Sequence, residues 1–369
     1  MNRDDDFVPQ VITIAGRFGV RPVAWNSVTG GFSNAKLFRL TDGDGNQFAL
    51  RLTPHTSALP VERLTLLHHL LNHLAASQFS IVPVPLPVLD GENAESLFLT
   101  RLAPTFLKTE NHVIQMEPWL PGKACPMEDI SEGQLRNAMR CLAEFHFEAA
   151  VWGSHLPHQN WFSVKVAPSP GLLRRLDLLR LLRQHELATL LNAAANDRNP
   201  EFRRPAESHL KLWQPRLTHV IQLCEQLENT DFRLSPVIRD VWRDHILFCG
   251  DEVTGMIDLT AAGTDHPVLD LTRLLRSWFG RDSKRVHAAF DMYSQQVAMT
   301  SLERTLFQAL DLASVILSPV TWFRRRYLEG RLQETDAPDV IRRIHELTDF
   351  AAEIAAALSN PGREHDPVT

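Results

Sequence analysis

The alternation of apolar and polar positions in the first hundred or so residues predicts an antiparallel sheet with one helix. Residues 35–42 (AKLFRLTD) and 47–52 (QFALRL) are typical of two strands, and the intervening GDGN predicts a hairpin turn. Residues 61–76 (VERLTLLHHLLNHLAA) carry leucines at helical spacing, so we expect a helix with one side packed on the sheet. SLFLTRL and HVIQMEPW predict two further strands.

The pattern becomes helical after LPGKACP. ISEGQLRNAMRCLAEFHFEAA begins with a candidate cap at Ser131, and two more helical stretches follow at roughly 170–195 and 205–229. HILFCG and VTGMIDL predict two strands across the turn DEVTG, and helices resume from Val268 to about residue 359. The order predicts a small sheet-and-helix part, a short hinge, and a larger helical part with one inserted pair of strands.

The composition is that of an ordinary globular protein. The chain has 369 residues, of which 44% are hydrophobic and 22% charged, and a net charge of −6 with no basic stripe. Its four cysteines form no C-x-x-C pair, the N-terminus lacks the features of a signal peptide, and no apolar run approaches the roughly 20 residues of a membrane span. We therefore expect a cytoplasmic protein with neither a nucleic-acid nor a membrane partner.

Two features of the predicted sheet could bind phosphate. Gly30 and Gly31 in the turn TGGFSN would let backbone N–H groups point at phosphate oxygens, although a Gly-Gly pair between strands is more often only a turn. Arg51 lies in the middle of a strand, where a cation needs a partner, and Glu62 at the start of the next helix is the candidate. The alternative for Arg51 is an edge-strand residue that faces water.

The stretch VIRDVWRDHILFCGDEVTGMIDLT contains the strongest chemical pattern. Asp240 precedes a loop that ends at His245, and the hairpin that follows returns Asp258 close to His245. A carboxylate and an imidazole so placed could bind Mg²⁺ or Mn²⁺. Asp270 lies in an apolar helical run, so we expect backbone N–H groups of a neighbouring tight loop to satisfy it. The alternative is that each aspartate is an ordinary loop or surface residue. The chain has no Walker A, G-x-S-x-G or H-E-x-x-H motif.

Together these stretches resemble the aminoglycoside phosphotransferase and choline kinase-like superfamily, small-molecule relatives of the protein kinases. The matching segments run from TGGFSNAKLFRL through LAEFHFEAA and IRDVWRDHILF to GMIDLTAAGTDHPVLDLTRLL, and cover about residues 23 to 279. The resemblance implies an α+β, two-lobed protein-kinase-like fold, with a small antiparallel-sheet N-lobe containing one helix and a larger, mainly helical C-lobe. We place the N-lobe at 1–116, the hinge at 117–122, the C-lobe at 123–360 with an inserted helical region at about 158–233, and a flexible tail at 361–369.

The resemblance also implies a role for each candidate residue. ATP would lie in the cleft between the lobes, together with Mg²⁺ or Mn²⁺. Asp240 matches the catalytic aspartate and Asp258 the principal magnesium ligand, with His245 as a second ligand. The residues implied in ATP binding are Gly30, Gly31, Phe32 and Ser33 of the nucleotide loop, Arg51 with Glu62 at the phosphates, and Glu117 to Trp119 at the adenine.

Two departures from the family pattern leave the activity open. The usual His-Gly-Asp is here Ile238-Arg239-Asp240, and His245 replaces the usual asparagine. Arg239 could contact an anionic substrate or pair with a carboxylate of the C-lobe. Our leading hypothesis is a kinase that transfers the γ-phosphate of ATP to a hydroxyl group of a small polar metabolite. The alternatives are a pseudokinase that binds nucleotide or acts as a scaffold and, with no residue demanding it, a nucleotidyl transferase. The acceptor and the oligomeric state are not predicted.

Overall fold

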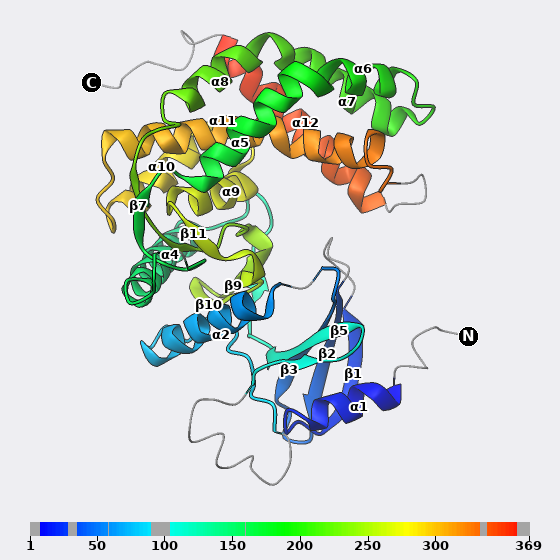
Figure 1. Ribbon diagram of the computed structural model, residues 1–369, viewed down its shortest axis with the longest axis vertical. Coiled ribbons are helices and arrows are strands. Elements are labelled where there is room, and N and C mark those ends of the chain that lie inside the picture. The colour runs from blue at the N-terminus through cyan, green and yellow to red at the C-terminus, as the bar shows by residue number, and fades with distance from the viewer. Residues whose placement is uncertain are drawn as a thin grey trace.

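The computed structural model describes residues 8–28, 35–57, 59–89, 104–158, 160–332 and 338–359. The turn TGGFSN, the predicted strand SLFLTRL and the predicted C-terminal tail lie outside these residues. The described chain forms a small N-terminal lobe built on a sheet and a larger C-terminal lobe built mostly from helices (Figure 1). This is the two-part order that the sequence predicts.

The N-terminal sheet has five antiparallel strands in the order β1-β2-β3-β5-β4. The hairpin predicted at GDGN joins β2 to β3, with Leu40 opposite Phe48 and Leu37 opposite Arg51. Phe38, Leu40 and Leu50 are buried in a core on one side of the sheet. The strands are β1 (Pro22–Val28), β2 (Lys36–Asp42), β3 (Gln47–Pro54), β4 (Leu107–Lys108) and β5 (His112–Pro118).

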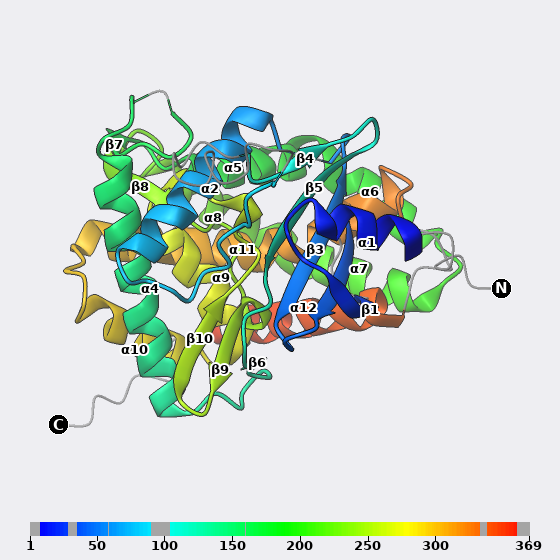
Figure 2. The same ribbon diagram turned by 90° about the horizontal axis from the view of Figure 1, so that it is seen from below.

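The helix that packs on the sheet core is not the one that the sequence predicted. Helix α1 (Val8–Gly16) contributes Val11 and Ala15 to the sheet core. Helix α2 (Val61–Ala76) has the predicted bounds, but its buried leucines join the core of the C-terminal lobe, and the helix lies beside α4 (Glu132–Gly153) in both ribbon views (Figures 1 and 2). The leucine face of α2 therefore packs on the C-terminal lobe and not on the sheet, which α2 contacts through the buried His68, 2.8 Å from Gln115 of β5. Helical spacing identifies an apolar face but not its partner.

The C-terminal lobe contains two small sheets where the sequence predicted one strand pair. Strands β10, β9 and β6 form one sheet and β11, β8 and β7 the other. The second sheet brings β8, which precedes the loop of Asp240, next to β11, which follows Asp258. The strands are β6 (Lys123–Ala124), β7 (Lys165–Ala167), β8 (Phe232–Val237), β9 (Ile246–Cys249), β10 (Glu252–Met256) and β11 (Gly263–Asp265).

Helices make up the rest of the larger lobe. Helix α4 begins with a capping box in which the Ser131 hydroxyl accepts from the Gln134 N–H, as the sequence predicted for Ser131. Helix α7 begins at Pro200, earlier than predicted, because Asn199 caps it. The other helices are α5 (Pro170–Leu181), α6 (Leu187–Ala195), α7 (Pro200–Trp213), α8 (Leu217–Glu225), α9 (Val268–Phe279), α10 (Ser283–Ser294), α11 (Ser301–Tyr327) and α12 (Pro338–Ser359).

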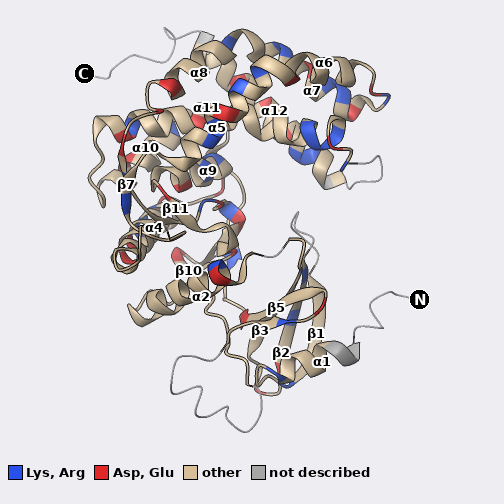
Figure 3. Cartoon of the chain, in the orientation of Figure 1, with Lys and Arg blue, Asp and Glu red and all other residues tan. Residues whose placement is uncertain are grey.

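Helix α11 is long and apolar enough to cross a membrane, which the sequence reading did not anticipate. Its most apolar 18-residue window has a mean hydropathy of 1.4, and 72% of that window is buried inside the protein. The apolar residues of α11 are therefore accounted for as core, where they pack against α5, α9 and α12. Charged residues of both signs are interspersed along the described chain (Figure 3).

Candidate active site

The three charged side chains that the predicted phosphate transfer needs most line the same cavity, which has a volume of about 780 Å³. Arg51, Asp240 and Asp258 all line it, from three different parts of the chain. Arg51 projects from β3 of the N-terminal lobe, Asp240 lies in the loop after β8, and Asp258 lies two residues after the end of β10. The fold thus brings together residues up to 207 positions apart in sequence.

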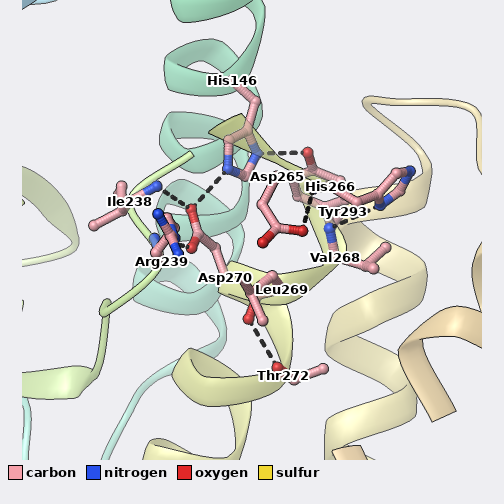
Figure 4. Close-up of polar contacts among 10 residues, drawn as sticks. All are labelled: His146, Ile238, Arg239, Asp265, His266, Val268, Leu269, Asp270, Thr272 and Tyr293. Atoms are coloured by element: carbon pink, nitrogen blue, oxygen red, sulfur yellow. Dashed lines mark hydrogen bonds and ion pairs between the residues drawn. The ribbon is translucent and has the colours of Figure 1, made fainter. Parts of the chain in front are cut away.

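Asp270 holds the loop that carries Asp240. Its carboxylate is fully buried and accepts the N–H groups of Ile238 at 2.7 Å and Arg239 at 2.6 Å (Figure 4). Arg239 has a left-handed backbone with φ 68°, a conformation that costs of order 1–3 kcal/mol in a residue other than glycine unless its surroundings impose it. The two hydrogen bonds impose it, and these are the contacts expected of Asp270 from the sequence.

A buried histidine supports Asp270 from the other side. His146 on α4 lies 3.0 Å from the Asp270 carboxylate through Nε2 and 2.7 Å from the Tyr293 hydroxyl through Nδ1 (Figure 4). A carboxylate can only accept, so Nε2 of His146 carries the proton and Nδ1 accepts from the tyrosine O–H. The sequence reading missed His146, although it lies in the quoted stretch LAEFHFEAA.

His245 connects the loops of Asp240 and Asp258. The indole N–H of Trp242 donates to its Nε2 at 2.6 Å, so Nε2 is the acceptor, and Nδ1–H donates to the carbonyl of Asp240 at 3.0 Å. Burial lowers the pKa of His245 against the opposing effect of the Asp258 and Asp240 carboxylates. The imidazole is therefore neutral, and its Nε2 lies 3.8 Å from Asp258 Oδ2.

The Asp258 carboxylate faces the cavity with one oxygen engaged. Asp258 Oδ1 accepts from Thr260 Oγ1 at 3.1 Å and from the guanidinium of Arg51 at 3.4 Å. For Oδ2 the described residues provide only the longer approach of His245. The backbone of Asp258, two residues after β10, is left-handed, with φ 58° and ψ 54°, so the chain leaves the extended conformation of the strand here.

These residues fit a divalent cation bound together with phosphates. Within the described ranges no three His, Cys, Asp or Glu side chains gather as a metal cage. Mg²⁺ bound with a nucleotide needs only one or two carboxylates because the phosphates and water supply its other ligands. Asp258 Oδ2 meets that need. His245 would meet it only if Trp242 released Nε2, so its role as a second ligand stays a prediction.

The predicted pair Arg51–Glu62 does not form. Glu62 is exposed near the start of α2, and the carboxylate that Arg51 reaches is that of Asp258. The next residue, Arg63, makes the connection from α2 instead, and donates to the carbonyl oxygens of Ala261 at 3.2 Å and Ala262 at 2.8 Å. The sequence reading chose an acidic partner and missed that a basic residue of the same turn can hold the Asp258 loop through its backbone.

The predicted adenine contacts are partly taken up by the sheet. The Trp119 N–H donates to the carbonyl of Gln47 at 2.9 Å, and the Trp119 ring stacks under Arg39 at 4.7 Å. That N–H is therefore not free for a nucleotide. The Glu117 side chain faces Arg51 and Asp258, and burial raises its pKa to about 7, with Arg51 opposing the shift and Asp258 adding to it. Gly30, Gly31, Phe32 and Ser33 lie outside the described residues.

Arg239 points away from the cavity that contains Asp240. Its guanidinium lies against Gly263, where a Cβ would come within 2.8 Å of it, and its charge lowers the pKa of the neighbouring Asp265, which burial raises overall. The lining residues of the large cavity do not include it. Of the two readings of Arg239, the structure thus favours proximity to a C-lobe carboxylate over contact with a substrate.

The fold and the site define a kinase-like phosphotransferase, and comparison with known proteins assigns the family. The model of the phosphotransferase enzyme family matches residues 24–305, which is well over half of the chain. The chain therefore belongs to this family. It is 28% identical over 108 residues to a homoserine kinase of Janthinobacterium sp. (strain Marseille), a match that covers 28% of the chain and 31% of that protein.

Solved structures of the same fold cover nearly the whole chain. A spectinomycin phosphotransferase in complex with ADP and spectinomycin superposes with a TM-score of 0.59 at 13% identity, over 94% of this chain and 98% of that one. An amicoumacin kinase in complex with AMP-PNP, Ca²⁺ and Ami gives a TM-score of 0.59 at 12% identity, over 95% of this chain and 93% of that one. An aminoglycoside phosphotransferase from Alicyclobacillus acidocaldarius gives 0.58 at 15% identity, over 96% of both chains. These likenesses confirm the α+β kinase-like fold.

Proposed function

We propose that the protein transfers the γ-phosphate of ATP to a hydroxyl group of a small molecule, with Asp240 as the group that receives the hydroxyl proton. The observation that carries this proposal is the placement of Asp240, Asp258 and Arg51 on one cavity, with His245 bridging the two aspartate loops. Phosphoryl transfer requires mainly that reactants be positioned and that charge on the phosphates be neutralised, and this set of groups supplies both.

Each step of the proposed reaction can be assigned to one of these groups. The acceptor oxygen attacks the γ-phosphorus as the bond from that phosphorus to the β-phosphate oxygen breaks, and the hydroxyl proton passes to the Asp240 carboxylate. ADP leaves and the acceptor departs as a phosphate ester. Arg51 places a guanidinium next to the Asp258 carboxylate, where it neutralises phosphate charge. A divalent cation held by Asp258 would add positive charge at the same phosphates.

The alternative of a pseudokinase depends on Ile238, Arg239 and His245. Arg239 lies beside Asp265 and outside the cavity, so its long side chain does not obstruct the space next to Asp240. Ile238 offers the same backbone N–H to Asp270 as any other residue would. Neither departure removes a group that the reaction needs. His245 replaces the asparagine that the family uses as a metal ligand, and the carboxylate of Asp258 can hold the cation without it.

The test is an acceptor screen with purified protein, ATP and either Mg²⁺ or Mn²⁺, followed by ADP release. Small polar alcohols are the acceptors, and L-homoserine is included because the curated relative is named a homoserine kinase. We expect acceptor-dependent ADP release that Asp240→Asn lowers at least a hundredfold, a loss comparable to that of one transition-state contact. ATP binding without acceptor-dependent turnover under either metal would support the pseudokinase instead.

A further inference from the structure

Arginine is the dominant charged residue around the cavity as a whole. Among the described lining residues there are eight arginines, six carboxylates and no lysine. Several of the arginines are already committed to carboxylates, as Arg281 is to Glu353 at 2.7 Å and Arg276 is to Asp311 at 2.6 Å. Two arginines differ from these: one forms no ion pair with any carboxylate that the structure describes, and the other pairs with Asp240, which is itself a reacting group. These two arginines indicate which ligand the cavity could bind.

Arg175 on α5 is the first of these. Its Nε donates to the Ser314 hydroxyl of α11 at 3.0 Å and one Nη to the carbonyl of Gly171 at 3.1 Å, and both partners are neutral. No carboxylate of the described chain lies within ion-pair distance of it, although Asp265 is near enough to raise its pKa. Burial nevertheless lowers the pKa of Arg175 to about 10. A partly buried cation held only by neutral groups is better stabilised when an anion completes it.

Arg273 on α9 is the second. It lies three residues after Asp270, on the same side of the helix, and approaches the Asp240 carboxylate to 2.7 Å. The pair is about half exposed to the cavity, at 51% for Arg273 and 46% for Asp240. Arg273 and Arg175 line the same cavity, and Arg273 is close enough to Arg175 to lower its pKa.

The ion pair with Arg273 opposes the role of Asp240. Arg273 covers Oδ1 of Asp240, so this oxygen cannot receive the acceptor hydroxyl while the ion pair holds. An anionic group on the acceptor would compete for Arg273 and release Asp240. It would also supply the carboxylate or phosphate that Arg175 lacks, since a planar guanidinium binds either group through two parallel hydrogen bonds.

We propose that the acceptor is a small hydroxy compound with an anionic group, either a carboxylate or a phosphate, and that this group binds between Arg175 and Arg273. The proposal rests on the proposed function, because it concerns the acceptor of the same transfer. In this proposal Arg175 selects anionic acceptors, and Arg273 leaves Asp240 free to react only when such an acceptor binds. It also separates this protein from acceptors whose only charge is positive, which the same arginines would repel.

The test compares acceptors that differ only in charge. Glycerate carries a carboxylate, glycerol 3-phosphate a phosphate, glycerol no charge, and 3-amino-1,2-propanediol a positive charge. ADP release is measured for each, and each is also titrated against the thermal unfolding midpoint of the protein in the absence of ATP. We expect glycerate or glycerol 3-phosphate to exceed both other compounds at least tenfold in kcat/KM, and only the anions to raise the unfolding midpoint. The better of the two anions identifies the group.

Variants of Arg175 make the test specific. Arg175→Gln keeps a donor for Ser314 but removes the charge, so KM for the anionic acceptor should rise ten- to a hundredfold with a smaller change in kcat, and Arg175→Lys should recover part of the loss. Arg180→Gln is the matched control, because Arg180 lies on the same helix but pairs with Glu225 and Glu228. Circular dichroism and ATP binding check that each variant folds.

Three results would overturn the proposal of an anionic acceptor. Equal or better turnover of glycerol or the amine, or an unchanged KM in Arg175→Gln, overturns the proposal. So does a lack of both turnover and anion-dependent stabilisation with glycerate and glycerol 3-phosphate. Failure of the proposed function itself looks different: anions would still stabilise the wild type and not Arg175→Gln, while no acceptor of any charge, in this set or in the wider screen, would release ADP.

Discussion

Replacement of Asp270 by asparagine tests how the site is held together. The change keeps the size of the side chain but turns one oxygen into an N–H donor, which then opposes the N–H of Ile238 or of Arg239, both of which now donate to Asp270. The hydrogen bond from His146 at 3.0 Å also loses its charged acceptor. Each hydrogen bond to a buried charge contributes roughly 1.5–3 kcal/mol, so the loss of one or two should lower the free energy of unfolding by about 1.5–6 kcal/mol.

The same change should reduce activity by more than the loss of folded protein explains. Arg239 would lose the contact that holds its left-handed backbone, and Asp240 follows it directly in the chain. A displacement of about 1 Å at a reacting group costs on the order of a hundredfold in rate. Urea unfolding gives the stability, and ADP release at a temperature where the variant is folded gives kcat. Asp291→Asn is the control, because Asp291 forms an exposed ion pair with Arg304. A stability loss under about 1 kcal/mol together with an unchanged kcat would refute the reasoning.

Three further changes test separate parts of the account. Arg51→Met should lower kcat/KM for ATP by about a hundred- to a thousandfold, since it removes one charge contact to the phosphates, and an unchanged value in ADP-release assays would count against the role of Arg51. Trp242→Phe removes the donor to His245 Nε2; if His245 binds the cation, the Mn²⁺ concentration for half-maximal activity should fall about three- to tenfold, whereas no shift would leave Asp258 as the ligand. Hydrogen bonds from His266 and Thr300 lower the pKa of Glu303 to about 2, so its contribution is fully present above pH 4.5 and is lost as the pH falls toward 2. Glu303→Gln should accordingly be less stable than the wild type at pH 7, and the difference in urea midpoint should shrink below pH 4.5; a difference that stays constant down to pH 3.5 would be inconsistent with this pKa.

The sequence predicts those features of the fold and of the site that depend on residues close together in the chain. The hairpin around GDGN, the helix at 61–76 and the cap at Ser131 follow from turn residues, helical spacing and side-chain capping, all of which act over a few residues. The burial of Asp270 and its hydrogen bonds to loop N–H groups could be predicted because a carboxylate in an apolar run must find donors.

The contacts that depend on packing between distant segments could not be read in this way. Spacing did not reveal that α2 packs on α4, nor that Arg51 pairs with Asp258 across the cavity while Glu62 faces solvent. The contact of Arg273 with Asp240 could have been predicted, because Arg273 follows Asp270 by about one helical turn and so lies near the same loop. The hydrogen bond from the Trp242 indole to His245 Nε2 could not be predicted, because no hydrophobic or turn pattern in the sequence indicates it.

The central claim is that Asp240 and Asp258 jointly serve phosphoryl transfer from ATP, and the most direct measurement follows the phosphate itself. ATP labelled at the γ-phosphate is incubated with the best acceptor from the screen, and the label in the product is quantified for the wild type, Asp240→Asn and Asp258→Asn. We predict that the wild type transfers the label to the acceptor, and that each variant loses at least a hundredfold in rate while it remains folded. Label transfer at the wild-type rate in either variant would contradict the account.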